Sequence, residues 1–187
     1  MKSDAAEVHI RRMSVADVSR VFMIAWSRKH ATHWPREAYL AALKPDATPQ
    51  RIALVAEDPA DGRGPLLLDW KAPNYEEPEK SPPSDGKAES GRVVGFLIAS
   101  VLAPQSELES IAVSAAEQRR GVGRRLFLAM AEALRAAGVN EVFLEVRASN
   151  QRAFDFYRSL GWNETGRRPR YYADPEEDAV LMSLKLE

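Results

Sequence analysis

The sequence predicts a single mixed α/β domain in which helices cover a central sheet. Its 187 residues are enough for one domain with a sizeable core and hardly enough for two. Apolar residues make up 45% of the chain and charged residues 28%, which is the balance of a globular protein. In the second half, strand-like and helix-like apolar patterns alternate, as they do in α/β proteins. We therefore expect one domain over residues 1–187.

The first half of the chain predicts three strands and two helices. Residues 8–12 are expected to form a short strand, and residues 16–28 a helix, because apolar side chains recur there at helical spacing. A second short helix is expected after Pro35. Residues 51–56 and 93–102 have the apolar character of two partner strands.

Between these two strands the composition changes. Six of the twelve prolines lie in residues 59–91, together with several acidic residues and the stretch SPPSDGKAESG. Such a segment cannot bury enough apolar surface to offset the entropy of ordering it, so we expect a mobile surface insertion. Four large apolar residues within it are expected to pack on the domain or on a partner: Leu66, Leu67, Leu68 and Trp70.

The second half predicts strands that alternate with helices. In chain order these are strand 108–113, helix 121–137, strand 141–147, helix 150–160 and strand 179–186. Gly138 is a stop signal for the first of the two helices. Residues 167–178 are expected to form a loop before the last strand.

A strand, glycine turn and helix follow one another where residues 108–113 lead into the segment QRRGVG at 118–123. Gly121 and Gly123 remove side chains where a ligand would approach the backbone, and the N–H groups of the first helical turn are anion donors. Four arginines surround this turn: Arg119, Arg120, Arg124 and Arg125. At the positive end of a helix dipole each cation is disfavoured by roughly 0.3 to 1 kcal/mol. A bound anion would offset this cost, so the turn predicts a phosphate site.

Several other sites are excluded by motifs that the sequence lacks. A dinucleotide fingerprint needs a third glycine where Leu126 stands, and neither a Walker GK[ST] nor a GxSxG segment is present. The chain has no cysteine and therefore no thiolate ligand or acyl-cysteine, and its histidines, His9, His30 and His33, form no metal-ligand pattern.

The formal net charge of −1 provides no global field for nucleic acid or an acidic membrane. A charged N-terminal segment and short apolar runs favour a cytoplasmic location, and no metal is expected.

The motifs together resemble the GNAT acetyltransferases, in particular the RimI type, which acetylates protein N-termini. The segments that carry the resemblance are IAV at 111–113, QRRGVG at 118–123, LEVRASN at 144–150, Tyr157, LGW at 160–162, GRRPRYY at 166–172 and EDAVLMSL at 177–184. The resemblance implies a mixed central sheet of six to seven strands, about four flanking helices and a splay between two neighbouring central strands. The insertion at 59–91 is longer than the hairpin usual in this family.

The resemblance also implies residues that bind acetyl-CoA as co-substrate. The backbone of Ile111, Ala112 and Val113 would pair with the pantetheine arm within the splay. The pyrophosphate would be held by Arg119, Arg120, Gly121, Val122, Gly123 and Arg124. Asn150 would touch the cofactor near its thiol. Asn150 also suits the N-cap of the helix that follows, with Ser149 as a competitor for that position.

Two catalytic residues follow from the same resemblance, Glu145 as general base and Tyr157 as general acid. Period-two alternation places Glu145 on the less apolar face of its strand, where a plain ion pair with an arginine is the alternative. Glu109, on the neighbouring strand, is an alternative base. Tyr157 lies on the inward face of its helix, which also suits simple packing. Because the ordinary pKa of tyrosine, about 10, exceeds the roughly 8.5 of a thiol, we expect Tyr157 mainly to hydrogen-bond the departing sulfur.

The predicted function is transfer of acetyl from acetyl-CoA to an amine. The N-terminal α-amine of a protein, for example a ribosomal protein, is the expected acceptor, and Tyr171, Tyr172 and Glu109 are expected to contact it. Two alternatives remain open: an acetyltransferase for lysine or a small-molecule amine, and a non-enzymatic CoA-binding sensor module. The presence of both Glu145 and Tyr157 argues against the sensor.

Overall fold

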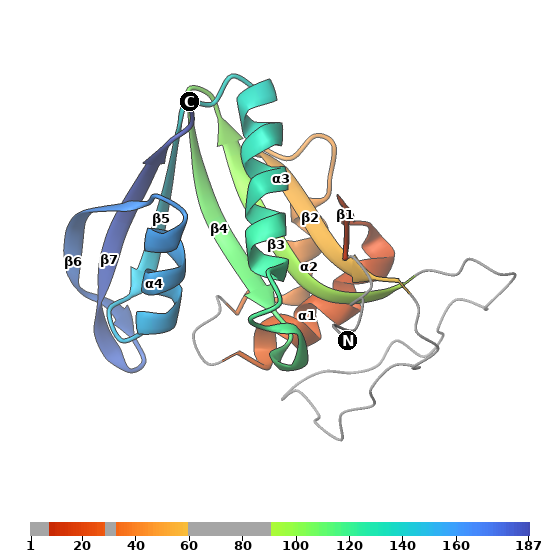
Figure 1. Ribbon diagram of the computed structural model, residues 1–187, viewed down its shortest axis with the longest axis horizontal. Helices are drawn as coiled ribbons and strands as arrows, with labels where there is room; N and C mark the ends of the chain where they lie inside the picture. Colours follow the sequence, from red (N-terminus) through yellow and green to blue (C-terminus); the bar gives the residue numbers. More distant parts are fainter. Residues whose placement is uncertain (1–7, 29–32, 60–90) are drawn as a thin grey trace, which may run out of the picture.

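A seven-stranded mixed sheet with helices on both faces forms the body of the protein (Figure 1). It is seen in a computed structural model, which describes residues 8–28, 33–59 and 91–187. Over these residues the strand order is β1-β2-β3-β4-β5-β7-β6, and four α-helices flank the sheet. The predicted mixed sheet of six to seven strands with about four helices is thus confirmed.

Four antiparallel strands make up the N-terminal side of the sheet. They are β1 (His9–Arg12), β2 (Gln50–Asp58), β3 (Arg92–Leu102) and β4 (Gln105–Val113). The predicted pairing of the second and third strands is confirmed, and Asp58 and Arg92 are their last register partners. Apart from its two end residues, the insertion predicted at 59–91 lies outside the described residues, as do the four apolar residues expected to pack there.

One face of this half of the sheet is covered by the helices near the N-terminus (Figure 1). The segment predicted as one helix over residues 16–28 is a 3-10 turn, η1 (Val15–Asp17), followed by α1 (Val18–Trp26). The predicted second helix is α2 (Arg36–Ala42). Their buried side chains form a core with β2 and β3 around the ring of Phe96.

The opposite face is covered by α3 (Val122–Ala136) and α4 (Gln151–Ser159) (Figure 1). The buried stripe of α3 packs on the sheet and comprises Val122, Leu126, Phe127, Met130, Ala131 and Leu134. The helix ends before Gly138, whose φ of 78° lies in the left-handed region, as its stop signal predicted. Within the described part of the chain, no helix combines the length and apolar character needed to cross a membrane.

The predicted splay lies between β4 and β5 (Glu141–Arg147). These strands run parallel, and their register pairs extend only from Gln105 with Glu141 to Glu107 with Phe143. Beyond this point β4 continues beside β3, and β5 continues beside β7 (Glu176–Lys185). The backbone edge of β4 from Leu108 onward is therefore left without a β5 partner.

The segment predicted as a loop at 167–178 is instead largely a strand, β6 (Asn163–Ala173). That prediction was wrong because β6 is an edge strand with nearly every residue exposed, so it lacks the apolar alternation by which strands are recognised. It also contains Pro169, which sits where the register with β7 shifts, and an edge strand tolerates such a residue. The turn itself is confined to Asp174 and Pro175.

Candidate active site

The phosphate turn, residues 118–123, has the backbone of an anion site. Gly121 precedes α3 with a φ of 80°, and Arg119 also has a positive φ, 65°. The first helical hydrogen bond is donated by the Arg125 N–H to the Gly121 carbonyl at 3.0 Å. The N–H groups of Val122 and Gly123 therefore precede the helical ladder and can donate to an anion.

The two glycines of the phosphate turn are required for different reasons. Gly121 has a left-handed backbone with open space around its Cα, so conformation explains the glycine. A Cβ on Gly123 would lie 3.2 Å from Cζ of Phe156, so at this position the close packing of α3 against α4 leaves little room for a side chain. We predicted that both glycines leave space for a ligand beside the backbone, and only Gly121 has such open space.

The arginines of the phosphate turn are not equivalent. Arg120 forms an ion pair with Glu117, whose carboxylate is buried and is also bound by Arg92 at 2.9 Å. Part of the charge of Arg120 is thus already compensated within the protein. Arg119 and Arg124 are exposed beside the helix N-terminus, where an anion could reach both.

The described residues fit an extended phosphate-bearing ligand such as acetyl-CoA. The phosphate turn offers backbone donors and exposed cations, and the neighbouring edge of β4, including Ile111, Ala112 and Val113, is not paired with β5. A ligand lying along this edge could pair with the backbone as a further strand would. Its reactive end would then approach the point where β4 and β5 meet.

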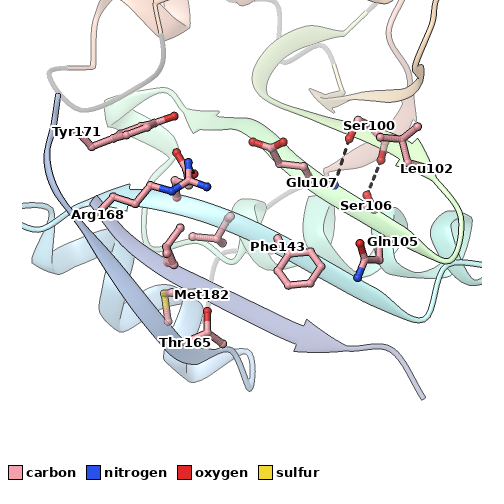
Figure 2. Close-up of a pocket in the computed structure, with 13 residues that line it drawn as sticks. Ser100, Leu102, Gln105, Ser106, Glu107, Phe143, Thr165, Arg168, Tyr171 and Met182 are labelled. Atoms are coloured by element: carbon pink, nitrogen blue, oxygen red, sulfur yellow. Dashed lines mark hydrogen bonds and ion pairs between the residues drawn. The ribbon is translucent and has the colours of Figure 1, made fainter. Parts of the chain in front are cut away.

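At that point lies a pocket of about 590 Å³, here called the splay pocket (Figure 2). It is lined by residues of five strands: Ser100, Leu102, Gln105, Ser106, Glu107, Phe143, Leu144, Glu145, Thr165, Arg168, Tyr171, Leu181 and Met182. On β5, Val142, Leu144 and Val146 are buried while Phe143 and Glu145 are only partly covered, as the predicted alternation requires. The volume is within the range of small-ligand sites.

Glu145, the predicted base, is held by two neighbours on β6. Its carboxylate accepts from the Arg168 guanidinium at 2.5 Å. A hydrogen bond to Glu145 also raises the pKa of the Tyr171 hydroxyl, which therefore stays protonated and donates to the carboxylate. Arg168 in turn lies over the Tyr171 ring, 5.4 Å from its centroid. The alternative role considered for Glu145, an ion pair with an arginine, is therefore present in the structure.

Glu109, the alternative base, is held more firmly than Glu145. Arg51 of β2 binds both oxygens of its carboxylate, at 2.7 and 3.0 Å. The Arg51 guanidinium also lies 6.0 Å from the centroid of the Trp34 ring. Glu109 does not line the splay pocket. Its geometry is that of a bidentate ion pair tying β4 to β2.

Glu107 is the pocket carboxylate that the sequence prediction missed. It lies on β4, lines the splay pocket, and its pKa is raised by desolvation first and then by the charges of Glu109 and Glu145. The residue as a whole remains exposed, so one side of it still meets solvent. The predicted strand began at Leu108, although the alternation of Gln105 to Glu109 could have extended it and placed Glu107 beside Glu109 on one face.

Tyr157, the predicted acid, is buried on α4 and does not line the splay pocket. Burial, with a smaller contribution from Tyr172, raises the pKa of Tyr157 far above its ordinary value. Its ring packs against Trp162 with centroids 5.7 Å apart. The hydroxyl therefore remains protonated, which suits a hydrogen-bond donor and makes full proton transfer to a thiolate more costly.

The remaining predicted residues lie around the same strands. Asn150 is the N-cap of α4, where its side chain accepts from the Ala153 N–H at 3.3 Å. Tyr171 lines the splay pocket, whereas Tyr172 lies outside it with Arg147 4.1 Å from its ring centroid. The structure thus brings Glu145 and Tyr171 together in one pocket, and it places Glu109 and Tyr172 at its border.

This fold and arrangement define an N-acetyltransferase of the GNAT class. The sequence profile described as Acetyltransferase (GNAT) family matches residues 36–162, more than half of the chain, and the chain belongs to this family. Members of the family use acetyl-CoA as acetyl donor. The predicted GNAT enzyme is thereby confirmed.

Within the family, proteins of the RimI type are similar to this chain. The ribosomal protein bS18-alanine N-acetyltransferase of Escherichia coli strain K12 is 40% identical over 100 residues, which cover 52% of this chain and 68% of that protein. The N-alpha-acetyltransferase RimI of Mycobacterium tuberculosis is 39% identical over 101 residues, which cover 52% and 62%. The crystal structure of the ribosomal-protein-S18-alanine N-acetyltransferase from Escherichia coli superposes with a TM-score of 0.69 at 26% identity, covering 97% of this chain and 95% of that one. The predicted RimI-like resemblance is confirmed.

Proposed function

We propose that this protein transfers the acetyl group of acetyl-CoA to the N-terminal α-amine of a protein. The observation that carries the proposal is the position of the splay pocket, where carboxylates gather at the point where β4 and β5 separate. The names of the similar RimI proteins support the same acceptor, an N-terminal alanine of a ribosomal protein in the Escherichia coli relative.

Acetyl-CoA would lie from the phosphate turn to the splay. The pyrophosphate would be bound by Arg119, Arg124 and the backbone of Gly121, Val122 and Gly123, with Arg120 at the border of this site because Glu117 holds it. Ile111, Ala112 and Val113 would present their backbone to the pantetheine arm, and Asn150 would lie near the thiol. When bound, acetyl-CoA supplies an activated acetyl group as a thioester.

Glu145 and Tyr157 would act at the two ends of the transfer. The Glu145 carboxylate would take the proton that the acceptor ammonium must lose, directly or through water, in the splay pocket, with Tyr171 and Tyr172 beside the peptide. The Tyr157 hydroxyl would donate to the departing sulfur. Direct transfer fits a chain without cysteine, which cannot form an acyl-cysteine.

An α-amine is favoured over lysine by its acidity. A protonated amine cannot attack a thioester, and the reference pKa of an α-amine, about 7.7 to 8.0, is well below the roughly 10.4 of lysine. Deprotonating lysine at the same pH therefore costs about 3 kcal/mol more. A carboxylate in a partly desolvated pocket is a sufficient base for the easier of the two reactions.

The test is turnover of acetyl-CoA against a panel of peptides. The panel contains N-terminal peptides, including that of ribosomal protein bS18, and the same peptides with a blocked N-terminus. We expect release of CoA with free N-termini and none with blocked ones. Turnover of blocked peptides through lysine would overturn the proposed acceptor, and acetyl-CoA binding without turnover of any amine would indicate a sensor module.

A further inference from the structure

A buried carboxylate lies directly before the phosphate turn, away from the acids of the splay pocket. Glu117 ends the short 3-10 turn η2 (Ala115–Glu117), and only 5% of the residue is exposed. Each of its two oxygens is bound by a different arginine, one by Arg92 of β3 at 2.9 Å and the other by Arg120 of the phosphate turn. A carboxylate buried this deeply is costly unless it is paired. The two arginines therefore hold Glu117 in place.

The pair with Arg92 ties Glu117 to the sheet. Arg92 is the first residue of β3 and the register partner of Asp58, the last residue of β2. The Asp58 carboxylate also lies 3.7 Å from the Arg92 guanidinium. The four side chains from Asp58 to Arg120 alternate between acid and base, so their formal charges cancel. Arg120 is therefore better suited to hold the turn than to add positive charge for a ligand.

The backbone of the phosphate turn requires such an anchor. Arg119 is exposed and has a φ of 65°, a left-handed conformation that is unfavourable for a residue with a Cβ. The side chains on either side of it are fixed: Gln118 donates to the Val113 carbonyl of β4 at 3.2 Å, and Arg120 binds Glu117. A residue stays in a strained conformation where its surroundings fix it on both sides.

We propose that Glu117 is a positioning residue for the cofactor, which holds Arg120 and thereby keeps the phosphate turn in its anion-binding conformation before acetyl-CoA arrives. This inference rests on the cofactor position given in the proposed function. Glu117 itself would not touch the ligand. A binding segment that is already ordered loses less conformational entropy when the ligand binds, so the affinity is higher. The N–H groups of Val122 and Gly123 and the side chain of Arg119 would meet the pyrophosphate without a change of backbone.

The positioning role predicts an effect opposite in sign to that of charge alone. If only electrostatic attraction mattered, removing a carboxylate near an anion site would strengthen binding, because one repulsive charge is lost. Removing an anchor weakens binding, because the ligand must then order the turn. Glu117→Gln separates the two effects, since it removes the charge and nearly keeps the shape of the side chain.

The test measures the dissociation constant of CoA by calorimetry with the full chain. Glu117→Gln is expected to raise it roughly tenfold, which is about the cost of holding one residue such as Arg119 in the left-handed region. The KM for acetyl-CoA should rise by a similar factor, while kcat at saturating acetyl-CoA and peptide stays near the wild-type value. Arg120→Gln should have a similar effect, and the double variant should bind no more weakly than either single variant, because the two residues act as one unit.

Asp17→Asn is the matched control. Asp17 is also a buried carboxylate, 6% exposed, and is bound by Arg11 of β1 at 2.8 Å. Its replacement should lower the melting temperature, as Glu117→Gln does, and leave the affinity for CoA unchanged. If Glu117→Gln does not fold, Arg120→Gln carries the test, because Glu117 keeps Arg92 as a partner in that variant. An unchanged affinity in Arg120→Gln then overturns the positioning role.

Three results with folded variants would also overturn it. The first is an unchanged or tighter affinity for CoA in Glu117→Gln; together with a weaker affinity in Arg120→Gln, this would make Arg120 a direct ligand of the pyrophosphate. The second is a fall in kcat with an unchanged dissociation constant. The third is an additive effect in the double variant. A wild-type protein that binds CoA and acetylates no N-terminal peptide would instead count against the proposed function and leave the role of Glu117 intact.

Discussion

The phosphate turn and the splay pocket differ in how many parts of the chain build them. The phosphate turn comes from one continuous segment, residues 118–123, and its anion donors are backbone groups of a single helix end. The splay pocket takes side chains from five strands, and its charged groups, Glu107, Glu145 and Arg168, come from three different strands, β4, β5 and β6. The first region is positive and exposed, while the second contains two carboxylates, of which Glu145 is paired with Arg168.

This difference separates binding from chemistry. A helix N-terminus with arginines binds any suitably placed phosphate and needs no particular acceptor. The pocket, by contrast, must recognise an ammonium and remove its proton, which requires a carboxylate within reach of the acceptor nitrogen. We therefore expect changes at the phosphate turn to alter cofactor affinity and changes around the pocket to alter turnover and its pH dependence.

The largest effect is expected for Tyr157→Phe on α4, a change outside both regions. Loss of a hydrogen bond to a charged group costs about 1.5 to 3 kcal/mol, so kcat should fall by roughly 10- to 150-fold. The KM values for acetyl-CoA and peptide should change little, because the bond to sulfur strengthens as charge develops. Steady-state kinetics measure this split. An unchanged kcat would remove Tyr157 from the mechanism.

A smaller effect is expected at the phosphate turn. Arg119→Ala and Arg124→Ala should each raise the KM for acetyl-CoA by about tenfold, which corresponds to about 1.4 kcal/mol of binding. The effect should weaken with added salt because both side chains are exposed. The kcat at saturating acetyl-CoA should stay near that of the wild type, as should both parameters in the control Arg12→Ala on β1. A fall in kcat with unchanged KM would contradict the separation of the two regions.

The smallest effect is expected for Arg168→Met in the splay pocket. Arg168 lowers the pKa of Glu107, so its removal should raise that pKa further. The titration of the Glu107 carboxylate, followed by NMR, should therefore move to higher pH by a fraction of a unit. The KM for acetyl-CoA should not change. A shift of this titration to lower pH would contradict the described environment of Glu107.

The same contrast explains what could be predicted from the sequence. The phosphate turn could be predicted because its signals, Gly121 and the arginines that oppose the helix dipole, are adjacent in the chain. The core strands could be predicted from their apolar pattern, and the splay was predicted from the family resemblance. The ion pair between Arg120 and buried Glu117 could not be predicted, because Arg92, which also binds Glu117, comes from a distant strand.

The splay pocket was the part that the sequence predicted least well. Glu145 and Tyr157 were identified only through the family motif, because a strand glutamate can simply form an ion pair and an inward-facing tyrosine can simply pack in the core. The edge strand β6 escaped prediction because it is exposed and contains Pro169. Without that strand, neither Arg168 nor its contact with Glu145 could be placed. Glu107 escaped because its strand begins three residues before the predicted start.

The central claim, acetylation of a protein N-terminal α-amine, is tested most directly by the position of the acetyl group on a product. A peptide with a free N-terminal alanine and one internal lysine is incubated with the protein and acetyl-CoA, and tandem mass spectrometry locates the modification. We predict that the acetyl group is found on the α-amine, with the lysine unmodified. Acetylation of the lysine with a free α-amine would contradict the account.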